Sequence, residues 1–324
     1  MRDRWCSRGL REELTAMRRM LFVYNPRAGQ EAIKGSLSRI LEEFTRYDYE
    51  IVVHPTKKAL DAERIIEKQG NEFDLIVCSG GDGTLDEVVT GMRRGAVRSP
   101  LGYIPAGSTN DFANSLGIPR QMRLAAKAIM EGSVYSCDIG RMGDDYFVYV
   151  AAFGTLSEVS YKTSQDWKNM LGHLAYILEG VKSLTNVKSW RMRWESEEYA
   201  GGGEFLYGMV TNSNSVGGFR GITGKDVTLN DGMFEVTLIK KPDNFIEWPA
   251  IINSVLTGEH SDYVVSFKTA KLEFFAEEAV PWTRDGEYGG DHTQCVIENI
   301  PRALPIIVPA DAALEQTQPD PVSD

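Results

Sequence analysis

The first half of the chain alternates between short apolar stretches and stretches in which apolar residues recur with the period of a helix. The apolar stretches that predict strands begin at Met20, Tyr49, Phe73 and Pro100. The stretches with helical spacing cover residues 33–44, 62–66, 85–92, 112–117 and 122–130. This alternation with short links predicts an α/β domain, in which helices cover both faces of an open parallel sheet.

The pattern changes from about Asp145 onward. Several stretches there alternate apolar and polar residues with a period of two, and turns separate most of them. These predicted strands cover residues 146–154, 190–197, 203–213, 232–240, 263–276 and 294–300. Two stretches of helical character, Trp167 to Val187 and Phe245 to Leu256, interrupt the series. The second half is therefore predicted to be a mostly antiparallel sheet domain.

Composition fits a chain of two domains with substantial cores, since it has 324 residues of which 42% are hydrophobic. The net charge of -11 argues against a protein that coats nucleic acid. Cys6, Cys78, Cys137 and Cys295 show no paired spacing, so they indicate buried thiols in a reducing compartment. No apolar run approaches the roughly 18 residues that a membrane span needs, so a soluble chain is expected.

Both ends of the chain are expected to lie outside the folded domains. Residues 1–18 lack the apolar segment of a secretory signal and are predicted to form a disordered extension. Residues 313–324 are polar and contain prolines, which predicts a disordered tail.

Four segments that follow the predicted strands have the residue types of loops. They are residues 25–29, 55–56, 79–84 and 106–111. Ligands of such sheets bind outside the carboxyl ends of the strands, so all four segments should open onto one edge. The glycines around Asp82 let backbone N–H groups approach a phosphate at the positive end of the next helix. Asp82 itself would repel a phosphate unless a divalent cation or its waters lay between them, and the alternative is a tight turn in which Asp82 caps the helix.

The segments SGGDGT and, some 20 residues later, PLGYIPAGSTNDFA resemble the diacylglycerol kinase catalytic family, in particular its soluble bacterial lipid kinases. The GGDGT loop alone is shared with NAD kinases, and GGDG occurs in phosphofructokinases, but GSTNDFA separates this chain from both. The opening NPRAG is similar to the family's Asn-Pro-x-x-Gly loop, although Gln30 stands where a basic residue is often found. The resemblance runs from about Leu21 to about Pro309.

This resemblance implies an NAD kinase/phosphofructokinase-like α/β domain followed by a β-sandwich. The nucleotide-binding domain would span residues 19–138, and residues 300–312 would return to it. The β-sandwich, which would receive the lipid acceptor, would span residues 139–299.

The same resemblance implies ATP as the phosphoryl donor and Mg²⁺ as the metal. It places Asp82, Asp111 and Asp138 around a magnesium ion in the cleft, and it makes Glu287 the base that accepts the proton of the acceptor hydroxyl. The implied nucleotide contacts are Asn25, Pro26, Arg27, Ala28, Gly29, Thr56, Gly80, Gly81, Asp82, Gly83, Thr84, Leu85, Asp86, Glu87, Ser108, Thr109 and Asn110. A second, structural magnesium is implied at Asp231, Met233 and Thr228. The residues alone also fit plainer roles, with Asp111 as a helix N-cap and both Asp231 and Glu287 in simple turns.

The expected reaction transfers the γ-phosphate of ATP to a lipid hydroxyl, with diacylglycerol as the first choice of acceptor and phosphatidic acid as the product. A sphingoid base, ceramide or phosphatidylglycerol as acceptor, and a non-catalytic nucleotide-binding regulator, are the open alternatives. The apolar and basic stretch from Trp167 to Trp194 fits either a membrane-surface helix or a helix that covers the sheet. We expect a cytoplasmic protein that meets its lipid at the inner membrane surface and has neither a transmembrane segment nor a nucleic-acid partner. A homodimer is left open.

Overall fold

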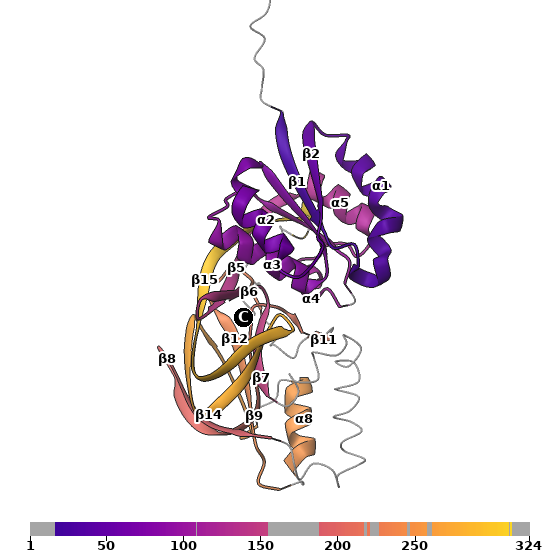
Figure 1. Cartoon of the computed structure of the whole chain (residues 1–324). Helices are drawn as coiled ribbons and strands as arrows, with labels where there is room; N and C mark the ends of the chain where they lie inside the picture. The colour runs from indigo at the N-terminus through magenta and orange to yellow at the C-terminus, as the bar shows by residue number, and fades with distance from the viewer. Residues whose placement is uncertain are drawn as a thin grey trace, which may run out of the picture.

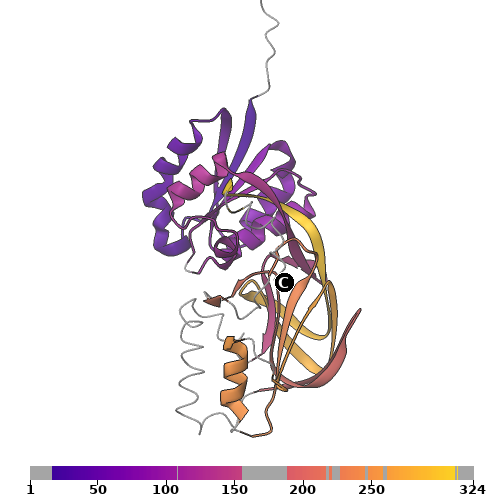
Figure 2. The same cartoon turned by 180° about the vertical axis from the view of Figure 1, so that it is seen from behind.

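The computed structural model shows two lobes, one above the other, joined by long strands (Figures 1 and 2). It describes residues 17–107, 109–154, 188–216, 219–220, 227–244, 247–257, 261–310 and 312. The predictions made for residues 1–16, for Ser108, for the helical stretch 167–187 and for the tail 313–324 lie outside the described residues.

The first lobe is built on a parallel sheet with the strand order β2–β1–β3–β4. Its strands are β1 (Arg18–Tyr24), β2 (Tyr49–Pro55), β3 (Leu75–Gly80) and β4 (Leu101–Pro105). β3 and β4 are buried along their whole length, as expected for central strands covered on both faces. Arg18 pairs with Tyr49, and its guanidinium lies 4.3 Å from the centroid of that ring. The strand β1 therefore includes Arg18, the last residue of the stretch 1–18 that was predicted to be disordered.

Helices cover both faces of this sheet, with α1 against α5 on one side and α2 against α3 on the other (Figure 1). They are α1 (Ala32–Phe44), α2 (Asp61–Gln69), α3 (Asp82–Arg94), α4 (Asp111–Ser115) and α5 (Met122–Glu131), with 3₁₀ turns η1 (Ala28–Glu31) and η2 (Gly70–Glu72). Gly91 lets α2 and α3 approach closely, because a Cβ at this position would lie 2.5 Å from the carbonyl oxygen of Glu63.

The helix α3 begins at Asp82, earlier than the apolar spacing from Leu85 predicts. Gly81 is its N-cap residue, and the carbonyl of Gly81 accepts the N–H groups of Thr84 (3.0 Å) and Leu85 (3.1 Å). Aspartate and glycine carry no apolar signal, so hydrophobic periodicity cannot detect a first turn that faces a ligand edge. Asp82 is thus a helical residue and does not lie in a loop.

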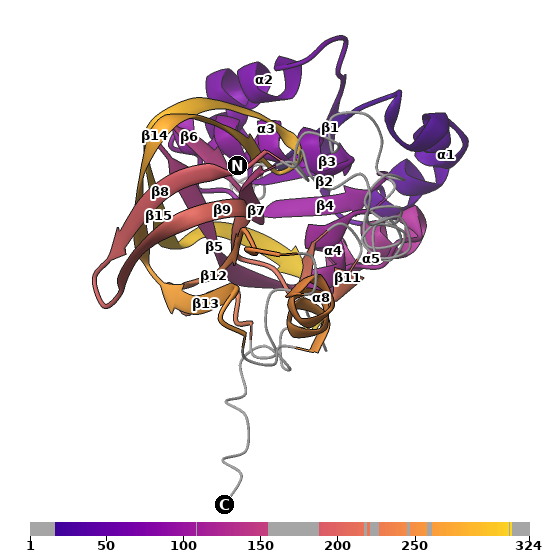
Figure 3. The same cartoon turned by 90° about the horizontal axis from the view of Figure 1, so that it is seen from below.

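The second lobe is a strongly curved, mostly antiparallel sheet, as predicted (Figure 3). Its elements are β5 (Ser133–Met142), β6 (Asp145–Phe147), β7 (Val150–Gly154), β8 (Trp190–Ser196), β9 (Ala200–Thr211), β10 (Ser215–Val216), β11 (Phe219–Arg220), β12 (Phe234–Lys240), α8 (Trp248–Thr257), β13 (Val264–Thr269), β14 (Lys271–Arg284) and β15 (Glu287–Val308). The predicted strand 263–276 is broken at Ala270, where the Thr269 hydroxyl donates to the Lys271 carbonyl (2.8 Å). β13 consequently pairs with β12, whereas β14 pairs with β15.

A cluster of buried aromatic rings holds this curved sheet together. The ring centroid of Phe153 lies 4.9 Å from that of Trp282, 5.9 Å from that of Phe274 and 6.3 Å from that of Trp190. Tilted and edge-to-face pairs of this kind contribute about 0.5–1.5 kcal/mol each beyond the area they bury. The second lobe therefore has a hydrophobic core of its own.

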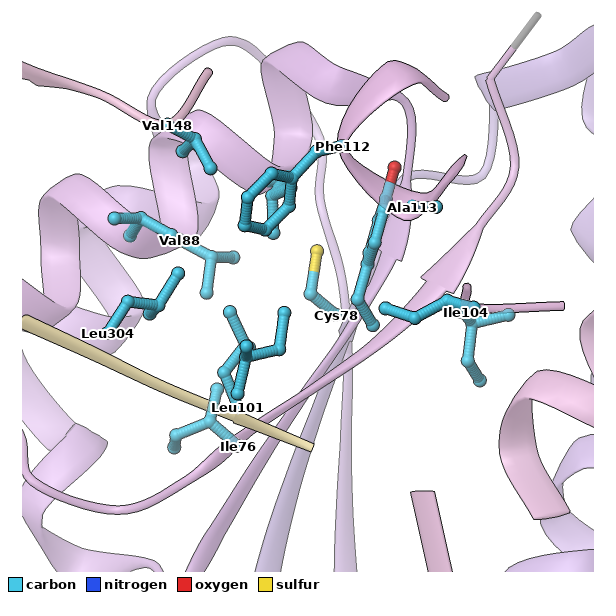
Figure 4. Close-up of a cluster of buried hydrophobic side chains, with 14 of the residues drawn as sticks. Ile76, Cys78, Val88, Leu101, Ile104, Phe112, Ala113, Val148 and Leu304 are labelled. Carbon is cyan, nitrogen blue, oxygen red and sulfur yellow. The ribbon is translucent and has the colours of Figure 1, made fainter. Parts of the chain in front are cut away.

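The strand β15 links the two lobes. Its first part pairs with β14 and its later part with β5, and near its end Ile306 pairs in parallel with Leu101 of β4. Side chains from beyond the first lobe's sheet enter that lobe's core, since Val148 and Leu304 point into the same cluster as Phe112 (Figure 4). The lobes are therefore held together by shared strands and by shared core.

The described cysteines Cys78, Cys137 and Cys295 are buried and have free thiols. Within the part of the chain that the structure describes, no helix has the length and apolar character needed to cross a membrane.

Candidate active site

A pocket of about 660 Å³ lies where the carboxyl ends of the parallel strands face the hairpin formed by β14 and β15. It is lined by Asn25, Arg27, Ala28, Gly29, Thr56, Lys57, Lys58, Ala59, Leu60, Gly81, Gly83, Thr84, Asp86, Glu87, Gly107, Arg284, Glu287 and Tyr288. Each of the four segments that follow the predicted strands contributes to this lining. Their convergence at one edge, which the strand pattern predicts, is therefore confirmed.

Asn25 ties the first of these segments to the third. Its backbone N–H donates to the Ser79 carbonyl (2.9 Å), and its side-chain amide donates to the Thr84 hydroxyl (3.4 Å). The carboxamide oxygen of Asn25 accepts the N–H of Arg27 (2.9 Å), which shapes the turn that follows β1. The N–H of Thr56 donates to the Tyr24 carbonyl (2.9 Å), so the second segment is fixed beside the first.

Two glycines bring the third and fourth segments into backbone contact. A Cβ at Gly107 would lie 2.8 Å from the Cα of Gly81, a distance that real Cβ atoms do not reach. Asn110 holds this loop, because its side chain accepts the Gly107 N–H (2.8 Å) and donates to the Gly107 carbonyl (2.8 Å). Asn110 was predicted to bind nucleotide. In the structure its side chain forms hydrogen bonds to the backbone of its own loop.

Asp82 lies at the start of α3 beside a second acid, Asp111. One of its oxygens, Oδ2, accepts the Thr109 hydroxyl (3.3 Å), whereas Oδ1 is buried without a hydrogen-bond partner among the described residues. Burial, together with the nearby charges of Asp111 and Asp285, raises the pKa of Asp82 to about 7. Asp111 is itself buried at the start of α4, whose N-cap is Asn110, so the plain N-cap role for Asp111 is wrong.

Asp138, which was predicted to share a magnesium ion with Asp82 and Asp111, has its carboxylate engaged elsewhere. Its Oδ1 accepts the N–H of Arg302 (2.6 Å), and its Oδ2 accepts the N–H of Gly232 (2.7 Å). The acid whose charge raises the pKa of Asp138 is Asp231, whereas the acids that act on Asp82 are Asp111 and Asp285. Asp138 therefore joins β5 to the bend of β15 and to the turn before β12.

The hairpin that closes the pocket turns at Asp285, a residue with a left-handed backbone (φ 48°). Its carboxylate is buried and accepts the N–H groups of Val148 (2.5 Å), Tyr149 (3.0 Å) and Val150 (2.9 Å). Burial raises the pKa of Asp285 to about 6, although these three N–H groups oppose the shift. A carboxylate engaged in this way fixes the turn, so it does not replace Glu287 as a base.

Glu287 follows this turn and is exposed to solvent at the pocket. A Cβ placed on Gly83 would lie 3.3 Å from Oε1 of Glu287. A carboxylate of the second lobe therefore reaches the first turn of α3 in the first lobe.

Two of the residues predicted to contact the nucleotide through α3 have other roles. Leu85 is fully buried in the core, and its backbone N–H donates to the Gly81 carbonyl. The prediction that Leu85 binds nucleotide is therefore wrong. Glu87 accepts the N–H groups of Leu60 (2.9 Å) and Ala62 (3.2 Å), which satisfies free donors at the start of α2. Glu87 still lines the pocket, but both of its carboxylate oxygens are engaged.

Several lining residues were not predicted from the sequence. They are Lys57, Lys58, Ala59, Leu60, Arg284 and Tyr288. Lys57 and Lys58 directly follow a predicted post-strand segment, and Arg284 and Tyr288 are close neighbours of Glu287 in the sequence. Proximity to residues already singled out was the signal that could have found them.

The turn at Asp231 lies before β12, away from the lining of the pocket. Oδ1 of Asp231 accepts the N–H of Met233 (2.9 Å), and Oδ2 lies 3.5 Å from Nζ of Lys268. Thr228 is exposed nearby in the sequence. Within the described residues, no group of three or more His, Cys, Asp or Glu side chains is arranged to hold a metal. The structural magnesium at this turn stays a prediction.

Comparisons with known proteins agree with this architecture. The family model of the diacylglycerol kinase catalytic domain matches residues 19–142, and that of the YegS C-terminal NAD kinase beta sandwich-like domain matches residues 150–308. A diacylglycerol kinase of Bacillus subtilis (strain 168) is 36% identical over 301 residues, which cover 92% of this chain and 98% of that protein. A diacylglycerol kinase of Staphylococcus carnosus (strain TM300) is 33% identical over 279 residues, which cover 84% of this chain and 90% of that protein.

The fold also has a counterpart among solved structures. A crystal structure described as a diacylglycerol kinase from Bacillus anthracis str. Sterne matches with a TM-score of 0.71 at 23% sequence identity, and the match covers 91% of this chain and 98% of that one. The two family models together account for both lobes, and the relatives match over nearly their whole length. The chain therefore belongs to the diacylglycerol kinase catalytic family and is a lipid kinase that uses ATP.

Proposed function

We propose that this kinase phosphorylates diacylglycerol to phosphatidic acid at a membrane surface. The observation that carries the proposal is the placement of Glu287, an exposed carboxylate of the second lobe, against Gly83 in the first turn of α3 in the first lobe. An acceptor hydroxyl held between the lobes would meet both a base and a phosphoryl donor. Relatives that match over most of this chain are named diacylglycerol kinase, which supports this choice of lipid.

The first lobe is suited to the triphosphate of ATP. Gly81 and Gly83 expose backbone at the positive end of α3, a helix of 13 residues. Backbone N–H groups and the helix dipole both favour phosphate there. Arg27, Lys57 and Lys58 line the same pocket and supply positive charge.

Glu287 would act as the general base. The acceptor oxygen forms a bond to the γ-phosphorus, the bond from that phosphorus to the bridging oxygen of ADP breaks, and the hydroxyl proton passes to the Glu287 carboxylate. Help from a positioned base is typically worth about 10²–10⁴ in rate. Asp285 anchors the turn through three backbone N–H groups, so the position of Glu287 is set by the fold.

The residues at the start of α3 and α4 fit a magnesium ion. Oδ1 of Asp82 is a buried acceptor without a partner among the described residues, and Asp111 brings a second carboxylate beside it. Hard oxygen ligands of this kind are those that Mg²⁺ prefers, with waters completing its shell. When bound, the ion would offset the negative charge of the phosphates. Asp82 and Asp111 would hold the ion, and Thr109 orients Asp82 through its hydroxyl.

A panel of lipid acceptors tests the proposal. The full chain is supplied with ATP, magnesium and mixed micelles of diacylglycerol, ceramide, a sphingoid base or phosphatidylglycerol. We expect labelled phosphate to appear chiefly in phosphatidic acid. A higher kcat/KM for any other lipid in the panel would overturn the choice of diacylglycerol, and absence of transfer to every lipid would point to a nucleotide-binding regulator.

A further inference from the structure

Arg284 is the residue that the reaction described so far leaves without a role. Four cations line the pocket, and three of them, Arg27, Lys57 and Lys58, come from the first lobe and are exposed. Arg284 is the last residue of β14 in the second lobe, and its side chain is only 19% exposed. Arg284 is therefore the one cation among these four that the second lobe places in the pocket, opposite the post-strand segments of the first lobe.

Arg284 is fixed by a chain of ion pairs. Its Nη2 lies 3.0 Å from Oδ2 of Asp145, whose Oδ1 lies 2.9 Å from Nη2 of Arg94 on α3. Arg94 in turn pairs with Glu63 on α2. Gly289 faces this side chain, since a Cβ at 289 would lie 3.3 Å from both Cγ and Nε of Arg284. The guanidinium is therefore pre-organised before any ligand arrives.

The guanidinium keeps donors that the described contacts do not use. A guanidinium carries N–H donors on three nitrogens, and the ion pair with Asp145 involves Nη2. Nε of Arg284 is buried without a hydrogen-bond partner among the described residues. Burial and the charge of Asp285 raise the pKa of Asp86, another lining residue, well above its usual range, although the charge of Arg284 opposes this shift. Such a cation is suited to bind an anion, and phosphate oxygens match its planar fork.

The position of Arg284 along the hairpin indicates which phosphate it meets. In the backbone ladder between β14 and β15, Arg284 is the strand partner of Glu287 across the turn. Glu287 reaches Gly83, and as the proposed base it must lie beside the acceptor hydroxyl and the phosphoryl group that is transferred. We propose that Arg284 binds the γ-phosphate of ATP from the second lobe, so that the enzyme distinguishes ATP from ADP. This inference rests on the proposed use of the pocket for the triphosphate and the proposed role of Glu287.

Equilibrium binding of ATP and of ADP, each with magnesium and without lipid, tests the inference on the full chain. For Arg284→Gln we expect the Kd for ATP to rise about tenfold or more, the range for a lost hydrogen bond to a charged group, and the Kd for ADP to change less than about threefold. The ATP preference of the enzyme should therefore collapse. A preference within about twofold of that of the wild type would overturn the inference.

Two controls separate this role from a structural one. Arg94→Gln removes the other partner of Asp145 but lies outside the pocket lining, so its ATP preference should stay within about twofold of that of the wild type. Lys57→Gln removes an exposed lining cation from the first lobe, and we expect it to weaken ATP and ADP alike. An equal loss of ATP preference in Arg94→Gln would mean that the ion-pair chain, not Arg284, sets it, and would overturn the inference.

If Arg284→Gln does not fold, Arg284→Lys keeps a charge beside Asp145 but lacks the planar fork. Its ATP preference should then fall at least about threefold, and an unchanged preference would overturn the inference. Failure of the wild type to bind ATP at all would instead overturn the proposed use of the pocket, so the two failures are distinguishable.

Discussion

Asp82 shows how a single carboxylate is placed where a cation would stabilise it. Burial and two neighbouring acids raise the pKa of Asp82 to about 7, and only the Thr109 hydroxyl and a backbone hydrogen bond oppose the shift. The unfolded value is about 3.9, so the folded protein holds this proton more tightly than the unfolded chain does. The stability that Asp82 contributes without metal is therefore fully present below pH about 4 and is lost as the pH rises through about 7.

Asp82→Asn should remove this loss, because the amide keeps the size of the side chain but cannot ionise. In buffer with a chelator, the Tm of Asp82→Asn relative to the wild type should rise between pH 5 and pH 8. Glu235, whose pKa is raised to about 7, is present in both proteins, so its titration largely cancels in the comparison. Thermal melts over this pH range check the prediction, and a Tm difference that does not depend on pH would contradict it.

At the scale of elements, the spacing of apolar residues predicted those strands and helices whose positions depend on packing against the core. The parallel strands of the first lobe, their helices and the antiparallel character of the second lobe follow from apolar positions, and the structure has them. The residues at which elements begin and end were not predicted by this spacing. α3 begins in a polar turn at Asp82, and the predicted strand over 263–276 breaks at Ala270, because hydrogen bonds and not apolar contacts set those positions.

In the candidate site, too, some features were predictable from the sequence and others were not. The convergence of the post-strand segments was predictable, because parallel strands end at one edge. Glu87 and Asp138 were identified by their place in motifs, yet each has both carboxylate oxygens engaged by distant backbone N–H groups. For Arg284 the sequence offered only its closeness to Glu287, because its position in the pocket depends on how the hairpin of the second lobe docks on α3. Contacts between segments far apart in the chain have no signature in a single sequence.

Asp138→Asn tests whether this acid joins elements or binds the cleft metal. The amide offers one acceptor where the carboxylate offers two, so the N–H of Gly232 or of Arg302 loses its partner. A lost hydrogen bond to a charged group costs about 1.5–3 kcal/mol, and we expect the free energy of unfolding to fall by that amount with and without magnesium. Urea unfolding in the two buffers measures it.

The exposed Asp144, close to Asp138 in the sequence, provides the control. Asp144→Asn should change the free energy of unfolding by no more than about 0.5 kcal/mol. A loss in Asp138→Asn that appears only when magnesium is present would assign Asp138 to the metal instead.

At the scale of the whole molecule, the two lobes form one working unit because the paired strands β5 and β15 join them. β15 runs from the hairpin at the pocket to a parallel pairing with β4, and Val148 and Leu304 enter the core of the first lobe (Figure 4). Three backbone N–H groups fix Asp285, and Glu287 then reaches Gly83 across the pocket. The proposed base is thus placed by one lobe and would take the proton of an acceptor hydroxyl that attacks a phosphate bound by the other.

The kinetics of Glu287→Gln test this arrangement most directly. The glutamine keeps the size and most hydrogen bonds of the side chain but cannot take the proton, so kcat should fall by at least about 10²-fold in an assay limited by chemistry. The Kd for ATP should change less than about threefold, because the carboxylate faces the acceptor. Glu278→Gln, an exposed position on the same hairpin, should keep the wild-type kcat. If Glu287→Gln retained more than about a tenth of the wild-type kcat, Glu287 would not be the base and the proposed division of labour between the lobes would be wrong.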